Sequence, residues 1–488
     1  MTFRAAAFIG ASWLAMTGAA AAQSTAQAAA DSPDARAARI QDLETRLQAL
    51  EAQLADLKES AAADAADIRR AQGEATQVTV DNGRPTIRSA NGDFSFAVRG
   101  LVQFDAARYG EDESAAGADL NSGTNFRRAR LGIEGTVFTD WNWNLTGEFG
   151  GTGGESTQLN QAWIEYAGWK PFGAEIPFRL RAGAWATPVN LEDATSNTEG
   201  LFLERPAPAE LVRSIAGGDG RTGFGAFVNG QRWTVNAVLT GAVIGAPATA
   251  EFDEQTGYLA RIAFLPLRGE NYSVHFGLNA SGILDPADTG AGLATTKSAR
   301  LRERPELRVD GTTLVDTAAI PASGVTQYGV ELAGVWKSLY LAGEWIDIAI
   351  DRSTAAFDPS FSGWYVQGAW TLTGERRQWN AANGGYQGIR PASPFNPKNG
   401  KWGAWEIGAR YSDLDLNDRA GVAGAATPAG GIRGGEQKIS TVGLNWYPNR
   451  TVRFLLEYQW VDVDRLNGAG ANLSADFQVL SFRSQLAF

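Results

Sequence analysis

The sequence of 488 residues lacks cysteine entirely and contains one histidine, His275, two methionines and seven lysines. Without cysteine there is no disulfide framework, and a single histidine provides no His–His or Cys–His pair for a transition metal. No apolar run after the first 22 residues approaches the roughly 20 residues of a transmembrane helix. The sequence therefore predicts no catalytic residue, no metal site and no cofactor.

The charged residues are unbalanced in two ways. The formal net charge is -11, which argues against nucleic acid as a partner. Among the 43 basic residues, however, 36 are arginine. A guanidinium group offers a rigid fork of donors that fits phosphate oxygens, and it is more weakly hydrated than an ammonium group. The arginines therefore indicate small anions as ligands, despite the negative charge of the whole chain.

The first 22 residues are typical of a secretory signal peptide. Arg4 precedes an apolar stretch at residues 5–19, and residues 20–22 provide a small-residue cleavage site. The apolar stretch is too short for a membrane helix. We expect residues 1–22 to be removed and the remaining chain to leave the cytoplasm.

Residues 23–78 are expected to form a helical segment followed by a linker. Within residues 32–71, apolar side chains recur at spacings of three and four over about three heptads, which is the seam of a coiled coil. Leucine at both seam positions does not fix the number of strands. We predict a periplasmic coiled coil that associates with other copies and offers a contact with the cell wall. The seam consists of Ile40, Leu43, Leu47, Leu50, Leu54 and Leu57.

Residues 79–488 alternate between apolar and polar side chains. Within residues 140–150, Trp141, Trp143 and Leu145 fall on one face, and the residues between them are polar. Segments of about ten residues match a tilted strand that crosses a bilayer, whereas a soluble all-β protein is the alternative. Aromatic residues at the strand ends favour the membrane, where they form interfacial girdles. These residues are Trp141, Trp143, Trp163, Tyr166 and Trp169, and the last strand ends with Phe488.

The alternating pattern predicts an all-β fold, namely an antiparallel transmembrane β-barrel preceded by the α-helical coiled-coil segment. At about 25 residues per strand with its share of loops, the roughly 410 residues give about 16 strands. A barrel of this size encloses an aqueous channel. We therefore expect residues 79–488 to form a porin domain in the lipid of a bacterial outer membrane.

A row of arginines within residues 299–308 is unexpected in an acidic protein. If this stretch is extended, the four side chains share one face about 7 Å apart, where like charges repel. Because proline is unwelcome in a central strand, Pro305 places the segment above the lipid or against the inner wall. We interpret the row as an anion-guiding column, and the alternative is a loop whose arginines pair with Glu303, Glu306 and Asp310. The column consists of Arg300, Arg302, Arg304 and Arg308.

Residues 191–222 interrupt the strand pattern and are long for a connection, which is typical of functional loops. Arg205 and Arg213 lie within this stretch. The glycine-rich sequence GGDGRTG at residues 217–223 lacks the Lys-Ser/Thr ending of a phosphate loop, and we interpret it as a hinge. Isolated arginines on strands are instead expected to pair with acidic residues of the wall. These are Arg99, Arg179, Arg181, Arg453 and Arg483.

Four stretches resemble the phosphate-selective porin O and P family. The sequence FRRARLGIEG (126–135) is similar to the second-strand motif of that family, and ATPVNLEDATSNTEGLFLER (186–205) is similar to its constriction-loop motif. Residues 405–418 and 434–458 are similar to its C-terminal signature. The resemblance implies a trimeric, 16-stranded outer-membrane channel whose third extracellular loop folds into the pore.

The resemblance also implies roles for individual residues. The arginine that ends the constriction-loop motif is an anion ligand in the family, and it falls on Arg205. The serine pair of the same motif falls on Ser196 and Asn197, and the arginine pair of the second-strand motif falls on Arg127 and Arg128. The resemblance thus implies a constriction that binds anions through these five residues. The arginine column is similar to one that some members carry.

The sequence departs from the family pattern at two places. Glu192 and Asp193 stand where the constriction loop usually presents a lysine, which weakens the attraction for an anion. Gln161 stands where the family has an aspartate, and the loss of this negative charge strengthens the attraction for an anion. These departures leave the net effect on selectivity open.

The sequence thus predicts a passive outer-membrane porin for small anions, with phosphate first and pyrophosphate or short polyphosphate next. We expect a homotrimer without enzymatic activity. Two alternatives stay open at this point. One is a porin of other or no ion selectivity, and the other is a structural protein that tethers the outer membrane to the cell wall through the coiled coil.

Overall fold

The computed structural model describes residues 33–81, 83–113, 119–151, 158–173, 176–244, 253–288, 297–354 and 357–488. The predicted signal peptide, residues 1–22, lies outside the described residues. Contacts divide the chain into one unit that ends at Ala75 and a second unit from Thr76 to Phe488.

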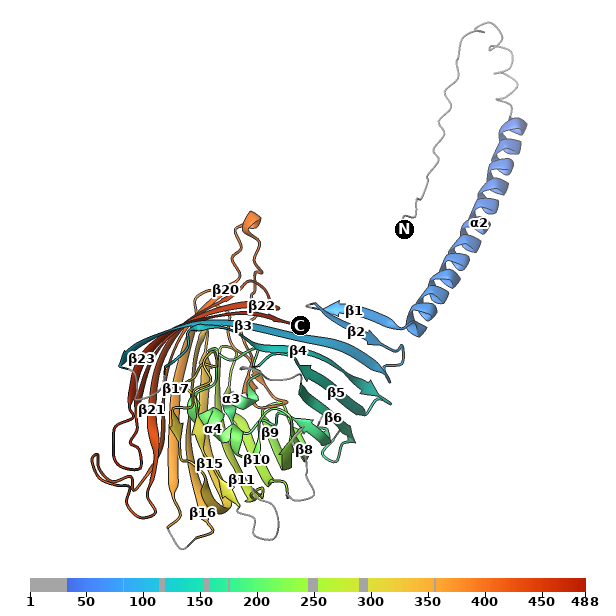
Figure 1. Ribbon diagram of the computed structural model, residues 1–488. Helices are drawn as coiled ribbons and strands as arrows, with labels where there is room; N and C mark the ends of the chain where they lie inside the picture. Colours follow the sequence, from blue (N-terminus) through green and yellow to red (C-terminus); the bar gives the residue numbers. More distant parts are fainter. Residues whose placement is uncertain are drawn as a thin grey trace. The chain divides into compact units, whose positions relative to one another are not determined.

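The first unit contains one long helix, α2 (Pro33–Glu74) (Figure 1). The seam residues from Ile40 to Leu57 are each more than half exposed within one protomer. The predicted helix is therefore confirmed, whereas the association of several copies stays a prediction. None of the described helices combines the length and the apolar character that crossing a bilayer requires.

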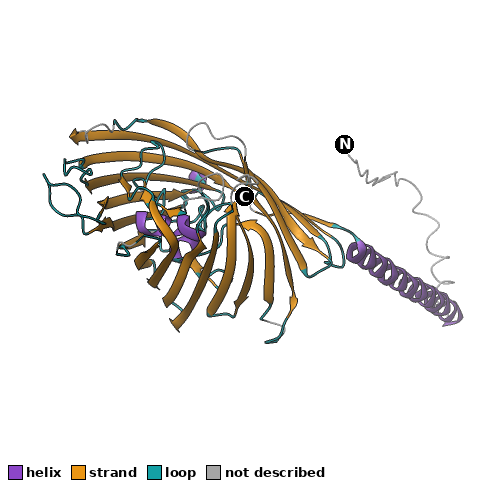
Figure 2. Ribbon diagram, turned by 60° about the horizontal axis from the view of Figure 1, so that its bottom comes forward, coloured by secondary structure: helices purple, strands orange, loops and turns teal. Residues whose placement is uncertain are grey.

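The second unit contains sixteen antiparallel strands that close into a barrel (Figures 1 and 2). Each wall strand pairs with the next, and the last one returns to the first, where Leu486 lies opposite Val102. The predicted 16-stranded barrel is confirmed. The wall strands are β3 (Ser95–Glu113), β4 (Gly123–Val137), β5 (Trp141–Glu148), β6 (Gln158–Trp169), β7 (Phe178–Trp185), β8 (Arg221–Asn229), β9 (Trp233–Val243), β10 (Thr256–Arg268), β11 (Tyr272–Asp285), β15 (Ile320–Trp336), β16 (Leu339–Arg352), β17 (Ser360–Thr371), β20 (Ala404–Asp418), β21 (Ile432–Tyr447), β22 (Val452–Asp464) and β23 (Ala475–Ala487).

The wall follows the alternation of the sequence. In β16, Leu339, Leu341 and Trp345 are exposed on the outside, whereas Tyr340 and Glu344 are buried on the lumen side. Successive side chains of a strand point to opposite faces, so one face meets lipid and the other meets the interior. The exposed apolar residues are therefore the lipid-facing surface of a membrane barrel.

Aromatic rings gather where strands end, as predicted. The rings of Trp141 and Tyr166 lie 4.9 Å apart between their centroids. The prediction is wrong for Trp163, which lies opposite Asn144 on the lumen side. The guanidinium of Arg181 lies 3.9 Å from the centroid of the Trp163 ring. Trp163 thus belongs to the polar interior of the barrel and not to a girdle.

The two ends of the barrel differ in their connections. Tight turns at residues 138–140, 230–232 and 337–338 define the turn end, and longer loops define the loop end. In outer-membrane barrels the short turns lie in the periplasm. A hairpin of β1 (Gln77–Asp81) and β2 (Arg84–Arg88) pairs with the start of β3 at the turn end.

The C-terminal residue is fixed against β3. The Phe488 N–H donates to the Gly100 carbonyl at 3.0 Å, and the Gly100 N–H donates to the Phe488 carbonyl at 2.9 Å. A Cβ atom on Gly100 would come within 2.5 Å of the Phe488 ring. Glycine at this position therefore lets the terminal aromatic residue close the barrel seam.

Three connections fold into the lumen. We name residues 186–220 the outer insert, residues 297–319 the row segment and residues 372–403 the turn insert. The first two enter from the loop end, and the third enters from the turn end. Their elements are α3 (Leu191–Ala194) and α4 (Ala207–Ala216) in the outer insert, β12 (Ser298–Ala299), β13 (Arg302–Glu303) and β14 (Val315–Asp316) in the row segment, and β18 (Trp379–Asn380), β19 (Gly385–Tyr386) and η1 (Pro397–Asn399) in the turn insert.

The row segment lies against the inner wall, which is one of the two places predicted for it. The Gln459 side chain donates to the Glu306 carbonyl at 3.1 Å, and the Ser412 hydroxyl donates to the Glu306 carboxylate at 2.5 Å. Arg410 of β20 forms an ion pair with the same carboxylate. These contacts hold the segment within reach of the outer insert.

Candidate functional site

The outer insert is positioned by its two short helices. The Asn190 side chain caps α3 by accepting a hydrogen bond from the Asp193 N–H at 2.8 Å. Helix α4 buries Leu211, Val212 and Ile215 in the hydrophobic core that the insert shares with the wall. Because the apolar face of α4 is buried, its charged residues are turned toward the interior of the lumen.

Arg205, the predicted ligand of the constriction, lies in the lumen and is ion-paired. Its Nη2 lies 3.3 Å from Asp193 Oδ1, and its Nη1 lies 3.4 Å from Glu210 Oε2. Arg213 contacts the same carboxylates at 2.6 Å and 3.3 Å. Burial alone would raise the pKa of Glu210, but Arg213 and Arg205 lower it to about 2. Asp193, one of the two acidic residues that stand where the resemblance implies a lysine, is thus a direct partner of Arg205.

Arg127 and Arg128 both face the lumen because of a β-bulge in β4. Gln103 lies opposite Arg128, and Phe104 lies opposite Phe126, which leaves Arg127 as an extra residue. Neighbouring residues of a regular strand point to opposite faces, whereas a bulge lets both point the same way. The bulge therefore brings the predicted arginine pair to one side of the wall.

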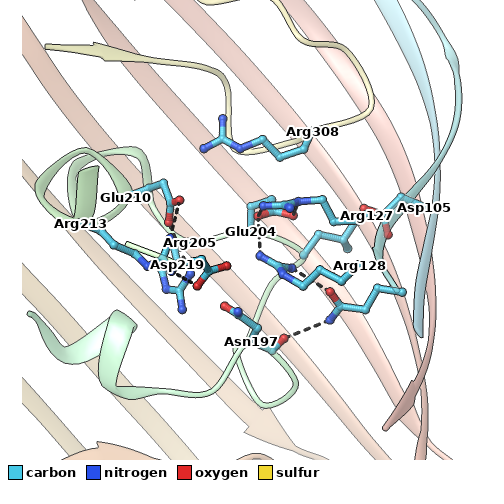
Figure 3. A network of polar contacts seen from close by, with 12 residues as sticks. Asp105, Arg127, Arg128, Asn197, Glu204, Arg205, Glu210, Arg213, Asp219 and Arg308 are labelled. Carbon is cyan, nitrogen blue, oxygen red and sulfur yellow. Dashed lines mark hydrogen bonds and ion pairs between the residues drawn. The ribbon is translucent and has the colours of Figure 1, made fainter. Parts of the chain in front are cut away.

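The arginine pair meets at a buried carboxylate, Glu204. Arg127 Nε lies 2.8 Å from Glu204 Oε1, and Arg128 Nη2 lies 3.6 Å from Glu204 Oε2 (Figure 3). Arg483 reaches Glu204 at 2.8 Å and Asp105 at 2.6 Å. Burial alone would raise the pKa of Glu204, but these arginines hold it well below its usual range. Glu204 is therefore an ionised carboxylate that Arg127, Arg128 and Arg483 share.

Ser196 and Asn197 lie beside this carboxylate. The Ser196 hydroxyl is 3.0 Å from the Thr198 hydroxyl, and the Asn197 carbonyl accepts from the Gln103 side chain at 3.1 Å. Both line a small recess of about 20 Å³ together with Arg128 and Arg205. The structure thus brings four of the five predicted constriction residues together, and Arg127 contacts them through Glu204.

The first three arginines of the predicted column share one face. Arg300 and Arg302 are exposed and Arg304 is partly exposed, and all three alternate with buried residues. Arg308 departs from this line because the chain leaves the extended conformation after Arg304, and its side chain is buried. The prediction of four arginines on one face is therefore correct for three of them only.

Two arginines of the column are paired with acids. Arg300 Nε lies 2.8 Å from Asp316 Oδ1, and Arg308 Nη2 lies 2.7 Å from Glu303 Oε1. No carboxylate among the residues that the structure describes pairs with Arg302. The alternative in which the arginines pair with nearby acids thus holds for Arg308 and Glu303.

Three neighbouring cavities lie in the barrel unit, and one of them reaches the turn end. The outer cavity, of about 440 Å³, is lined by the row segment and by Arg127. The middle cavity, of about 150 Å³, shares Arg127 with the outer one. The inner cavity, of about 580 Å³, shares Arg130 and Asp219 with the middle one and reaches Phe488 at the turn end. The shared residues make these cavities neighbours of one another.

The charge of the lining residues varies from one cavity to the next. Four arginines and two glutamates line the outer cavity. The middle cavity has two arginines, Arg127 and Arg130, against Glu148 and Asp219. Seven arginines and four carboxylates line the inner cavity. Two cationic spaces therefore flank one that is formally neutral, although the net charge of the chain is negative.

Sequence reasoning missed Arg130, Glu204 and Asp219 as members of the site. Arg130 Nη2 lies 2.6 Å from Asp219 Oδ2, and Arg213 Nη2 forms an ion pair with Asp219 Oδ1. A signal for Arg130 was present, because it is two residues from Arg128 on the same strand and so on the same face. No signal existed for Asp219, because its partner Arg130 is 89 residues away in the sequence and its pairing with Arg213 depends on the turn after α4.

His275 lies on the lumen side of β11 and holds the turn insert. Its Nε2 is 3.1 Å from Glu331 Oε2, and its Nδ1 accepts a hydrogen bond from Trp379 Nε1 at 3.1 Å. Because an indole nitrogen only donates, Nδ1 carries no proton and Nε2 donates to Glu331. Arg261 donates to the Gly384 carbonyl at 2.9 Å. The single histidine thus has a structural role in docking this insert.

The isolated strand arginines make contacts within the wall or with the inserts. Arg181 pairs with Glu165 at 2.7 Å, and Arg99 pairs with Glu134 at 3.0 Å. Arg453 instead donates to the Leu201 carbonyl at 3.1 Å. The prediction of wall ion pairs is confirmed for Arg99, Arg181 and Arg483, whereas Arg179 donates to the Asn229 side chain and Arg453 to a backbone carbonyl.

Comparison with known proteins agrees with this architecture. The model of the family described as phosphate-selective porin O and P matches residues 96–488. The chain belongs to this family. It is therefore an outer-membrane porin, a channel rather than an enzyme.

Two curated relatives match most of the chain. An uncharacterized protein of Caulobacter vibrioides is 27% identical over 421 residues, which are 81% of this chain and 76% of the relative. Porin O of Pseudomonas aeruginosa is 25% identical over 433 residues, which are 83% of this chain and 93% of the relative. The match to Porin O thus extends over nearly the whole of that protein.

Solved structures with similar chains are also outer-membrane proteins. The trimer form of OmpT from Vibrio cholerae is 12% identical with a TM-score of 0.47, and the alignment covers 81% of this chain and 99% of that one. An anion-selective porin from Comamonas acidovorans is 13% identical with a TM-score of 0.45, covering 81% and 100%.

Proposed function

We infer that this porin conducts small oxyanions by passive diffusion, with inorganic phosphate as the first substrate and pyrophosphate or short polyphosphate next. The route consists of the outer, middle and inner cavities. The proposal is supported by the arginines that line the two larger cavities and by the family to which the chain belongs.

One observation carries the proposal, and it concerns Arg308. This residue lines the outer cavity, and its Nη1 is buried without a hydrogen-bond partner among the described residues. A buried donor without an acceptor costs free energy, on the order of 1–3 kcal/mol. A phosphate oxygen would supply the acceptor once the Arg308 side chain turned Nη1 from its buried position toward the outer cavity. Arg302 and Arg304 line the same cavity and add to its positive potential.

The ion pairs of Arg205, Arg127 and Arg213 favour conduction of an anion over its tight binding. Conduction requires several sites, each of which holds the ion weakly enough to release it. Arg205, Arg127 and Arg213 already have carboxylate partners, so an arriving anion replaces or shares a contact instead of meeting a bare charge. This arrangement lowers the affinity at each step while keeping the donors in place.

Conductance of the purified protein in planar bilayers tests the proposed function. We expect the reversal potential in a potassium chloride gradient to show a preference for anions. Phosphate added to a chloride solution should reduce the chloride current in a saturable way, because the two anions compete for the same arginines. A cation preference, or a chloride current that phosphate leaves unchanged, would contradict the proposal.

We also propose that three copies associate and that the α2 seam contributes to this association. Six apolar side chains exposed along one helix face are costly in water, and burying them between copies removes that cost. Mass determination of the detergent-solubilised protein, with and without residues 33–74, tests this assembly. A monomer for the full chain would contradict it.

A further inference from the structure

Asp219 occupies a distinctive place on the proposed route. It is one of the residues shared by the middle and inner cavities, so it lies where one cavity gives way to the next. Its carboxylate bridges Arg130 on the barrel wall and Arg213 on α4. Figure 3 labels Asp219 and Arg213 of this bridge. One carboxylate thus connects the wall strand β4 to helix α4 of the outer insert.

Asp219 is also the most accessible of the carboxylates that pair with Arg130 and Arg213. Its side chain is 28% exposed, compared with 20% for Glu210, 14% for Glu148 and 2% for Asp193. An ion in the middle cavity therefore contacts both Asp219 and Glu148, and Asp219 is the more exposed of the two.

The backbone around Asp219 supports an exchangeable contact. Gly218 and Gly220 flank it with φ values of +98° and +68°, a region that residues with a Cβ atom rarely adopt. The turn lies between α4 and β8 and carries no apolar side chain of its own at residues 217–220. The carboxylate is consequently held by its two ion pairs rather than by packing.

The net charge of the residues that line the middle cavity depends on Asp219. Without Asp219 the middle cavity would have two arginines against Glu148 alone, and the step between the two cationic cavities would become cationic as well. A carboxylate and a phosphate offer guanidinium groups the same kind of oxygen acceptor. Asp219 therefore stands in for the permeating anion at Arg130 and Arg213.

We propose that Asp219 is a built-in competing anion that sets the affinity and selectivity of the channel. A phosphate ion entering the middle cavity displaces the Asp219 carboxylate from Arg130, and the carboxylate returns when the ion leaves toward the inner cavity. The competition prevents the arginines from trapping the ion. This inference rests on the proposed function and identifies a residue that determines its specificity.

The variant Asp219→Asn tests the inference, because it keeps the size of the side chain and removes its charge. We expect phosphate to inhibit the chloride current at about tenfold lower concentration, since local potential in a narrow polar space has effects of this order. The maximal phosphate current should fall, and the preference for chloride over potassium should rise. Asp219→Glu, which restores the charge, should return all three values toward those of the wild type.

A matched control separates Asp219 from wall carboxylates in general. Glu165 pairs with Arg181 on the wall, and neither residue lines the three cavities, so Glu165→Gln should leave affinity and selectivity unchanged. Heat-dependent gel mobility shows that each variant forms a folded barrel. If folded Asp219→Asn binds phosphate no more tightly than the wild type, or if Glu165→Gln has the same effect, the inference is overturned.

The same experiment distinguishes this inference from the proposed function. If phosphate does not inhibit the wild type, the preference for phosphate fails. The chloride-over-potassium ratio of Asp219→Asn still reports on Asp219 in that case, because removing a carboxylate from the route raises anion preference for any small anion. An unchanged ratio would overturn the role of Asp219 by itself.

Discussion

The outer insert and the turn insert both fill the lumen, yet they do so with different chemistry. The outer insert turns Arg205, Glu210 and Asp219 toward the cavities, where their ion pairs remain partly accessible. The turn insert is instead held to the wall by a buried ion pair, because Arg377 of the insert and Glu406 of β20 have side chains exposed by 2% and 1%. The outer insert contributes residues to all three cavities, whereas the turn insert lines the inner cavity only.

The contrast has a physical basis in how each insert is held. The turn insert is fixed by contacts that water does not reach, including the His275–Trp379 hydrogen bond and the contact of Arg261 with the Gly384 carbonyl. It adds residues 388–390 to the inner cavity. The outer insert instead combines a buried apolar face on α4 with charges at the water-filled side. A porin can thus use one insert for rigidity and one for selectivity.

The largest effect is expected from breaking the buried pair of the turn insert. In Arg377→Ala, Glu406 would keep a charge without its partner, which costs about 3–5 kcal/mol in a buried site. We expect residues 372–403 to become sensitive to protease and the single-channel conductance to rise as the insert leaves the lumen. Arg376→Ala is the matched control, because Arg376 is exposed and lies next to Arg377 in the chain. Equal effects of the two substitutions would remove the distinction between the inserts.

A smaller effect, limited to affinity, is expected at the arginine column. Arg308→Ala removes a charged donor with an unused N–H, so phosphate should inhibit chloride current about tenfold less effectively. Arg300→Ala should change this inhibition by less than about twofold, because Arg300 is exposed and already pairs with Asp316. Titrating the chloride current of both variants with phosphate in planar bilayers measures the difference in inhibition. If Arg300→Ala has the larger effect, the outer cavity is not where the anion is held.

The smallest effect is expected from acid. Burial would raise the pKa of Glu210, but Arg213 and Arg205 lower it to about 2, so its ion pairs contribute stability above pH 4.5 that is lost as the pH falls toward 2. The difference in anion conductance between the wild type and Glu210→Gln should therefore stay constant between pH 7 and pH 4 and should shrink below pH 4. A difference that disappears between pH 6 and pH 5 would contradict this assignment.

Much of the barrel could be predicted from the sequence, because alternation is a local property of each strand. The polar and apolar faces of residues 140–150 followed directly from it, whereas the number of strands followed from the length of the chain. Trp163 was misplaced because it lies three residues from Tyr166 in a regularly paired part of β6, so alternation itself puts the two side chains on opposite faces. The outer insert was also visible as a break in the strand pattern at residues 191–222.

Less of the candidate site could be predicted, because its partners come from distant parts of the chain. The sequence marked Arg205, Arg127 and Arg128 through resemblance, but it gave no sign that Glu204 joins the arginine pair to Arg483. The burial of the Arg308 side chain depends on where the row segment leaves the extended conformation. The turn insert was not recognised at all, since its polar residues resemble those of an ordinary surface loop.

By itself, the sequence determined that alternate residues would meet lipid and water, because side chains of a strand point to opposite faces whatever their neighbours are. Only the tertiary structure decided which charges stand together. The bulge at Arg127 turned two successive arginines to one side, and folding of the outer insert brought Asp219 between Arg130 and Arg213. Ion pairs are made through space, so their members are fixed by the closed barrel and its inserts and not by their order in the chain.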